Sequence, residues 1–182
     1  MSATTTTSIP TGTYAVDAGH SSVEFQVKHL GIATVKGFFS DFEGSLETAE
    51  DGTLSATGVV KARSLNTRNG QRDEHLRSPD FFDVDRHPEI RFQSTSIVPV
   101  DETSYRIVGD LTIRGITNEI ELEAVTQGSE QDPWGNTRVG LEVTGELNRE
   151  EFGLTWNQAL ESGGLLVGKN VKILLDVSAV KA

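Results

Sequence analysis

The sequence contains no cysteine, so disulfide bonds and thiolate metal sites are excluded and the redox compartment stays undetermined. It also has no apolar run near the roughly 20 residues of a membrane-spanning helix, which predicts a protein without a membrane span. Positive charge is scarce, because 16 Lys and Arg stand against 27 Asp and Glu and leave a formal net charge of −11 at pH 7. Phosphate backbones are bound through clustered Lys and Arg, so this composition argues against nucleic acid as a partner. It argues equally against docking on anionic membranes.

The N-terminal stretch lacks the features of a secretory signal. MSATTTTSIPTGT contains no positively charged segment and no apolar segment. We therefore expect residues 1–12 to be a disordered polar lead-in and the protein to be cytoplasmic. The remaining residues, 13–182, are expected to form a single domain, which at this length buries about 70% of its unfolded surface.

Alternation of apolar and polar residues dominates the chain after the lead-in. In HSSVEFQVKHLG, residues 20–31, Val23, Phe25 and Val27 alternate with polar side chains, which is typical of a half-buried β-strand. Comparable stretches recur to the C-terminus and predict eight or nine strands joined by short turns. The pattern predicts an all-β protein whose strands follow one another in an antiparallel meander, closed into a barrel because closure removes exposed edges.

One segment interrupts the alternation. Residues 66–88, NTRNGQRDEHLRSPDFFDVDRHP, lack the period of a strand. Residues 71–77 can form a short helix that buries Leu76, and Ser78-Pro79 matches the start of a second helical turn. Phe81 would pack that turn on an apolar surface. We expect a short helical insert across one end of the barrel.

Small residues raise the question of what fills the barrel. Gly58, Gly109 and Gly145 are in phase with the apolar residues of their strands. Eight strands leave room for side chains alone or for one elongated ligand. Inward glycines would enlarge a ligand cavity, but strand glycines also relieve bending in a tightly coiled barrel. The residues alone leave both interpretations open, with the second favoured.

The spacing of reactive residues predicts no catalytic centre. Asp17, His20 and Ser21 suggest a triad, but neighbours in sequence point in different directions and no strained turn surrounds the serine. His75 and His87 lie in the helical insert and match no metal-binding motif. We predict no catalytic residue, no metal ligand and no cofactor.

Positive charge gathers around the helical insert in four arginines: Arg63, Arg68, Arg72 and Arg77. One interpretation is that they pair locally with three carboxylates of the insert, Asp73, Glu74 and Asp80. The other is that they form a mouth that orients a phosphate or another polar head group, because the guanidinium fork suits such groups. Local pairing is favoured, and the two interpretations are compatible if one or two arginines remain free.

A set of motifs, taken in order, resembles one family. The motifs are YAVDAGHSSVEFQVKHLGI, VKGFFSDFEG, SLNTRNGQRDEHLRSPDFFDV, HPEIRFQST, GDLTIRGITNEIELEA, DPWG and EFGL, and they run from Tyr14 to about Val177. In these motifs the chain resembles the YceI-like family of lipocalin-like, polyisoprenoid-binding proteins. The resemblance implies an elongated eight-stranded antiparallel lipocalin-like barrel with an apolar interior that takes a long isoprenoid or fatty chain. It implies no catalytic group.

The resemblance also implies which side chains bind the ligand. Positions that match the inward strand faces of the family are Phe25, Val27, Phe92, Ile107, Leu111, Ile113, Ile120, Leu122, Leu141, Val143, Ile173 and Leu175. Four more side chains are expected toward the ends of the tunnel: Phe39, Phe42, Leu76 and Phe81. His29 ends its strand, where it either binds a head group or serves as a hydrogen-bonded structural histidine, and the structural role is favoured.

We expect a binding protein that stores or transports an isoprenoid or a similar amphiphilic lipid. Burying each CH₂ group contributes about 0.8 kcal/mol, so a long chain binds tightly with little polar recognition. One alternative is an enzyme that acts on such a lipid through Asp73, His75 or His29. Another is a packed barrel that serves as a stress or interaction module. The sequence leaves the oligomeric state open, with a homodimer among the options.

Overall fold

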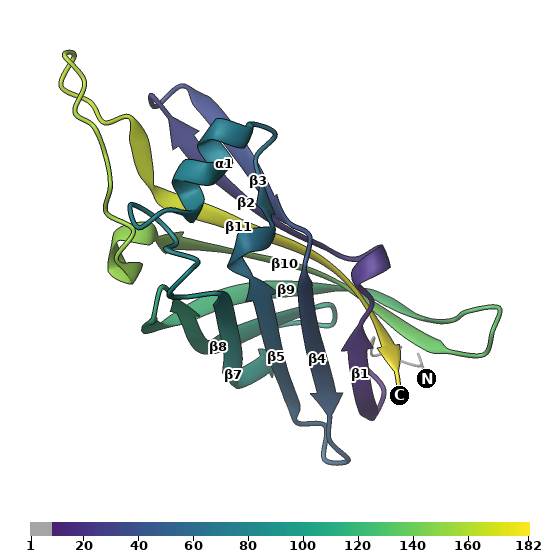
Figure 1. Cartoon of the computed structure of the whole chain (residues 1–182). Coiled ribbons are helices and arrows are strands. Elements are labelled where there is room, and N and C mark those ends of the chain that lie inside the picture. Colours follow the sequence, from purple (N-terminus) through teal and green to yellow (C-terminus); the bar gives the residue numbers. More distant parts are fainter. Residues whose placement is uncertain (1–8) are drawn as a thin grey trace.

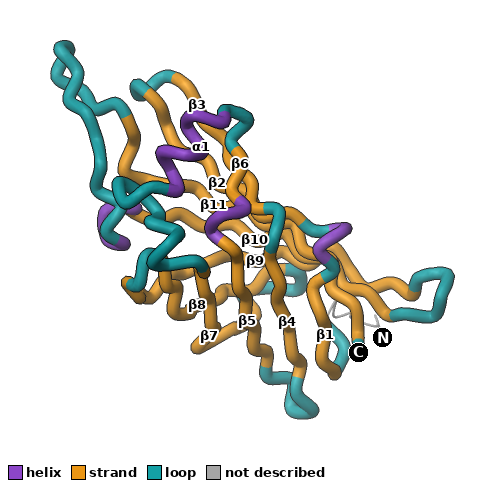
Figure 2. The backbone as a smooth tube through the Cα atoms, in the orientation of Figure 1, coloured by secondary structure: helices purple, strands orange, loops and turns teal. Residues whose placement is uncertain are grey.

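The alternating stretches become strands throughout the chain. The computed structural model describes residues 9–182, which contain eleven strands, one α-helix and three 3-10 turns (Figures 1 and 2). The strands are β1 (Gly12–Val16), β2 (Ser22–His29), β3 (Ala33–Phe39), β4 (Phe42–Thr48), β5 (Leu54–Lys61), β6 (Leu65–Asn66), β7 (Glu89–Pro99), β8 (Ser104–Ile113), β9 (Ile116–Gln131), β10 (Thr137–Asn148) and β11 (Val167–Lys181). The helical elements are η1 (Ala18–His20), η2 (Ala62–Ser64), α1 (Gly70–Arg77) and η3 (Arg149–Phe152).

The eleven strands of the described residues combine into eight long strands, which form a closed antiparallel barrel. β1 and β2 both pair with β11. On their other edges, β1 pairs with β4 and β2 pairs with β3. β3 then pairs with β6, and β4 pairs with β5. β1 with β2, β3 with β4, and β5 with β6 therefore act as three long strands, each interrupted once. With β7 to β11 they give eight strands in sequence order, and the predicted all-β meander barrel is confirmed.

Local hydrogen bonds replace the strand ladder where the long strands are interrupted. Asp17 caps η1 by accepting from the backbone N–H of Gly19 at 3.0 Å. The break between β3 and β4 is tied to η2, because the backbone N–H of Asp41 donates to Ser64 Oγ at 3.1 Å. These bends let β2 and β3 extend beyond β1 and β4 at one end of the barrel, where α1 lies beside them (Figure 1).

Packed structure begins before residue 13, within the stretch that the sequence predicts to be a disordered lead-in. Residues 1–8 of that lead-in lie outside the described residues, but Ile9 is buried in the core beside Tyr14. The hydroxyl of Tyr14 donates to the carbonyl of Pro10 at 2.7 Å. β1 already begins at Gly12, so the boundary at residue 13 falls too late.

The helical insert is present, with one difference from the prediction. α1 begins at Gly70, and its N-cap Asn69 accepts from the backbone N–H of Arg72 at 3.0 Å. Ser78 does not begin a second helix. Its carbonyl accepts instead from the backbone N–H groups of Phe81 and Asp83, each at 3.0 Å, so the chain folds into a hydrogen-bonded turn.

Candidate functional site

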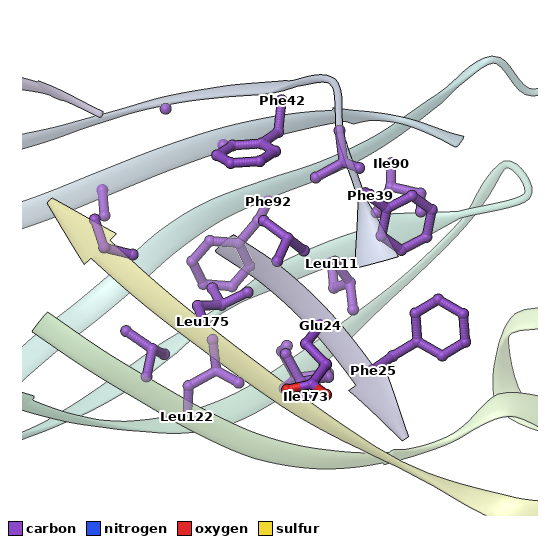
Figure 3. A pocket seen from close by; sticks show the side chains of 18 of the residues that line it. Glu24, Phe25, Phe39, Phe42, Ile90, Phe92, Leu111, Leu122, Ile173 and Leu175 are labelled. Atoms are coloured by element: carbon purple, nitrogen blue, oxygen red, sulfur yellow. The ribbon is translucent and has the colours of Figure 1, made fainter. Parts of the chain in front are cut away.

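The interior of the barrel contains an apolar cavity of about 320 Å³. Alternation along each strand sends every second side chain inward, so aliphatic and aromatic side chains from opposite sides of the barrel converge on it (Figure 3). Phe92, Leu111 and Leu122 come from β7, β8 and β9, and Ile173 and Leu175 from β11 (Figure 3). The packed-barrel alternative requires an interior filled by side chains. The cavity contradicts that requirement.

Sixteen of the seventeen side chains that the sequence predicts as ligand-binding lie on the cavity wall. They are Phe25, Val27, Phe39, Phe42, Leu76, Phe81, Phe92, Ile107, Leu111, Ile113, Ile120, Leu122, Leu141, Val143, Ile173 and Leu175. The structure thus brings together residues from all parts of the chain. Their contact with a lipid stays a prediction.

His29 is the predicted residue that lies away from the wall. It ends β2, where it pairs with Ala33 of β3 and Val167 of β11. Its ring makes no hydrogen bond to another residue of the described chain, 9–182, and both roles suggested for His29 stay predictions.

Much of the wall was missed by the sequence prediction. The further apolar side chains are Ile9, Val16, Val23, Leu46, Leu54, Ala56, Val60, Phe82, Ile90, Ile97, Tyr105, Ala124, Leu147, Phe152, Leu154, Val167, Val171 and Val177. Many continue the inward phase of residues that were predicted, as Val23 does for Phe25 and Val27. Applying the alternation to every strand would have identified the wall residues that lie on strands. Phe152 and Leu154 follow β10 and carry no strand signal.

Two of the three strand glycines do not enlarge the cavity, which was the interpretation that the sequence left open but did not favour. A Cβ on Gly109 would lie 2.5 Å from Cζ of Phe92, and one on Gly145 would lie 2.3 Å from Cδ2 of Leu122. Each of these glycines thus makes room for a large side chain of the neighbouring strand. Of the three, Gly58 alone borders the cavity.

The chemistry of the wall favours an apolar occupant. The cavity is lined mainly by aliphatic and aromatic side chains, which offer water few hydrogen-bond partners. An apolar chain that fills the space removes this surface from water, at about 25 cal/mol per Å² of apolar area buried.

One buried charge borders the cavity, at the end near α1. Arg149 is 4% exposed, and its Nε donates to the carbonyl of Gly168 at 2.7 Å. Its Nη1 donates to the carbonyls of Leu154 at 2.6 Å and Trp156 at 3.0 Å. The guanidinium carbon lies 5.9 Å from the ring centre of Phe81. Burial lowers the pKa of Arg149 below its ordinary value. Arg149 ties the segment after η3 to the start of β11 and so closes this end of the cavity.

The groups proposed for acid–base chemistry are held in structural contacts. Asp73 is buried and accepts from the backbone N–H and the hydroxyl of Thr67, at 2.9 and 2.5 Å. His75 lies edge to face against Trp156, with ring centres 4.6 Å apart, and its Nε2 is 2.8 Å from Oδ2 of Asp80. Neither Asp73 nor His75 borders the cavity.

The suggested triad is not assembled. His20 Nδ1 lies 2.8 Å from Oδ2 of Asp17, but the hydroxyl of Ser21 donates to the carbonyl of Ser178 at 3.2 Å. Asp17 Oδ2 also accepts from Nη1 of Arg138, at 2.9 Å. His20 and Ser21 therefore make no hydrogen bond to each other, although both lie close to Asp17 in the sequence.

Of the four insert arginines, Arg77 is the one that pairs with an expected carboxylate among the described residues, so the favoured interpretation is found only in part. Arg77 donates to Glu74 at 2.6 Å, and Arg63 pairs with Asp85 rather than with one of the expected carboxylates. Arg72 bonds the hydroxyl and carbonyl of Thr67 at 2.8 and 2.7 Å. The fourth, Arg68, is exposed.

Among residues 9–182, no three His, Asp or Glu side chains are placed to hold a metal ion together. Within the same residues, every helix is too short or too polar to cross a membrane.

Comparison of the sequence with protein families gives a match over nearly the whole domain. The profile of a family described as YceI-like domain matches residues 14–179. UPF0312 proteins of Staphylococcus aureus strains N315 and USA300 are each 43% identical to the chain over 162 residues, covering 87% of this chain and 92% of the relative.

Solved structures share the fold. The YCEI protein of Campylobacter jejuni superimposes with a TM-score of 0.73 at 26% identity, over 85% of this chain and 90% of that one. BcnA of Burkholderia cenocepacia superimposes with a TM-score of 0.78 at 18% identity, over 90% and 98% of the two chains. A polyisoprenoid binding domain from Saccharophagus degradans gives 0.71 at 15% identity, over 93% and 98%. The last two likenesses show the barrel fold alone.

Proposed function

The chain belongs to the YceI-like domain family, and from this premise we propose that its barrel binds the long apolar chain of an isoprenoid or a similar amphiphilic lipid. The observation that carries the proposal is the cavity of about 320 Å³, walled by aliphatic and aromatic side chains. A related fold from Saccharophagus degradans is described as a polyisoprenoid binding domain, which supports the same class of ligand.

The shape of the cavity suits an extended chain. Its wall follows β11 from Val167 to Val177, and ten residues of extended strand span roughly 33 Å. Apolar side chains line this whole length, so the ligand gains binding energy from burial, at about 0.8 kcal/mol per CH₂, rather than from hydrogen bonds. Discrimination between ligands then depends on chain length and on the ends of the cavity.

The proposed role is storage or transport of the lipid, without a reaction on it. The acid–base candidates Asp73 and His75 are engaged in structural contacts away from the cavity. Arg149, the buried charge at its end, is held by backbone carbonyls. The proposal is therefore that the lipid enters and leaves the cavity unchanged.

The first test identifies the cargo. The protein is purified without detergent, and its native mass spectrum is compared with the organic extract of the same sample. We expect one stoichiometric added mass, recovered in the extract as a lipid with an isoprenoid or fatty chain. A ligand-free mass, together with failure of added polyprenols and fatty acids to bind, would rule out the proposal.

A further inference from the structure

Exposed apolar side chains gather at one end of the barrel. Leu30 and Ile32, in the turn between β2 and β3, are 41% and 83% exposed, and Leu165, just before β11, is 43% exposed. The two segments touch, because the backbone N–H of Leu30 donates to the carbonyl of Leu166 at 2.9 Å. Single exposed aliphatic residues are ordinary, but a group of them at a protruding end marks an interaction surface. We call Leu30, Ile32 and Leu165 the apolar tip.

The strands behind the apolar tip carry most of the lysines. Lys28, Lys36, Lys169 and Lys172 lie on β2, β3 and β11, all are exposed, and they are four of the six lysines in the sequence. Gln26 pairs with both Lys36 and Lys172, so these two lysines flank it on one face of the sheet. No Asp or Glu occurs between residues 25 and 40, in a chain whose net charge is −11.

Acidic groups near these lysines offset much of the local charge, and one of them, Glu24, lies on β2 itself. Glu150 lies 3.9 Å from Lys169, Glu146 pairs with Lys172 across β10 and β11, and Glu161 lies in the loop before Leu165. Lys28 bonds a neutral group, the hydroxyl of Thr34, at 2.9 Å. The hairpin formed by β2 and β3 keeps its excess of positive charge beyond the cavity.

The apolar tip is continuous with the cavity wall. Val167 lines the cavity and follows Leu165 by two residues, and Val27 lines it and precedes Leu30 by three. In Figure 1 the β2–β3 turn and the loop before β11 project at the same end of the barrel, away from both chain termini. Any partner surface that binds the apolar tip would therefore lie next to the cavity.

We propose that this end of the barrel docks on a bilayer rich in anionic lipid. The apolar tip enters the acyl boundary, and Lys28, Lys36, Lys169 and Lys172 lie at the level of the phosphate groups. The rest of the acidic molecule is repelled from the same surface, which orients the barrel with the tip downward. Docking rests on the proposed function for its purpose, since it would place the cavity where lipid enters or leaves.

The test is cosedimentation of the full chain with vesicles of phosphatidylcholine alone or with 30% phosphatidylserine. We expect binding to the anionic vesicles that weakens as salt is raised. The double variant Leu30→Asn with Ile32→Ser should lose at least tenfold in affinity. Asparagine tolerates the positive φ of 57° at position 30, so the turn is kept. The double variant Lys36→Gln with Lys172→Gln should lose binding to the anionic vesicles specifically.

A matched control comes from the opposite end of the barrel. Trp134, in the turn between β9 and β10, is 80% exposed, and Trp134→Ser should leave vesicle binding unchanged. Absence of vesicle binding by the native chain would overturn the docking proposal, as would an equal loss in Trp134→Ser. A second measurement distinguishes the docking proposal from the proposed lipid function. The protein is loaded with lipid from cyclodextrin, and the bound lipid is measured by native mass spectrometry. Loading without docking overturns docking alone, and docking without loading overturns the proposed lipid function.

Discussion

Arg149 shows how one buried residue can hold an end of the cavity. Its guanidinium has no carboxylate within ion-pair distance among the described residues and is satisfied by backbone carbonyls of the segments on either side. Because these carbonyls are buried or partly buried, removing the donor leaves them without this partner. The residue therefore acts as a positioning group for the wall formed by Leu154 and Val167.

Arg149→Met should lower the free energy of unfolding by about 3 kcal/mol, since a buried polar group without a partner costs about 1–3 kcal/mol. Urea unfolding followed by circular dichroism measures it. Arg91→Met is the control, because Arg91 is exposed and pairs only with Glu89 at 2.7 Å, and it should change stability by less than about 0.5 kcal/mol. Equal stability of the two variants would contradict the role of Arg149.

Arg138 joins two carboxylates and makes part of the stability depend on acid pH. Hydrogen bonds from Arg138 and then His20 lower the pKa of Asp17 to about 2. Burial raises the pKa of Asp132, but the backbone N–H of Asn136 and the side chain of Arg138 outweigh it and bring that pKa to about 2. Both values lie below the ordinary 3.8, so these groups stabilise the fold above about pH 4 and lose that effect as pH falls toward 2.

Arg138→Met should accordingly lower Tm at pH 6, and the difference from the native protein should shrink as pH falls from about 4 to 2. Differential scanning calorimetry at a series of pH values measures the difference. Arg106→Met serves as the control, because Arg106 lies 3.9 Å from one exposed carboxylate, Glu121. A Tm difference for Arg138→Met that stays constant from pH 6 to pH 2 would count against this account.

At the scale of elements, two neighbouring strands pair closely where a large side chain of one strand packs over a glycine of the next. A Cβ on Gly109 of β8 would lie 2.5 Å from Phe92 and 2.6 Å from the backbone carbonyl of Gln93, both on β7. The ring could turn aside, but the carbonyl moves only if the β7–β8 pairing opens. Gly58 on β5 is different, since the nearest atom to a Cβ there is 3.8 Å away.

Gly109→Ala should therefore destabilise the protein by about 1–3 kcal/mol, the usual range for an overpacked core. Gly58→Ala should be neutral or slightly stabilising, because alanine loses less conformational freedom than glycine in a strand. Both are measured by the urea midpoint at constant slope. If the two substitutions had the same effect, close packing of Phe92 on Gly109 would not be the cause.

At the scale of the whole molecule, the cavity links stability to ligand. Leu141 lies on the cavity wall, and a larger side chain at this position enters the space that a lipid would occupy. An indole there reduces the empty volume in the ligand-free protein while it excludes the lipid chain. Stability and lipid uptake should consequently change in opposite directions.

Leu141→Trp should reduce lipid uptake at least tenfold, and its ligand-free Tm should equal or exceed that of the delipidated native protein. The control is Glu142→Trp, on the outer face of the same strand, which should take up lipid normally. Uptake is measured by native mass spectrometry and Tm by calorimetry. Normal uptake by Leu141→Trp would place the lipid elsewhere.

Net charge is another property that acquires meaning only in the whole molecule. A formal charge of −11 argued against anionic membranes, yet the fold gathers four lysines around the β2–β3 hairpin. Lys28 and Lys36 are separated from Lys169 and Lys172 by more than 130 residues in the sequence. Their proximity arises from the pairing of β2 with β11. A sum over the chain contains no information about that pairing.

The sequence by itself determined the strands and the direction of their side chains. Alternation is a local property, because a strand turns successive side chains to opposite faces whatever surrounds it. For that reason the inward residues of β7 to β11 could be predicted, and sixteen of the seventeen named positions line the cavity. The meander followed from the short turns between the strands.

The tertiary structure alone decided what the barrel contains and what its end presents. The volume of the cavity depends on the distances between strands and on which side chains fold over Gly109 and Gly145, and neither is encoded locally. The partners of Arg149 are carbonyls, which carry no residue-specific signal in a sequence. The apolar tip joins segments more than 130 residues apart. Contacts that span such distances exist only once the barrel has closed.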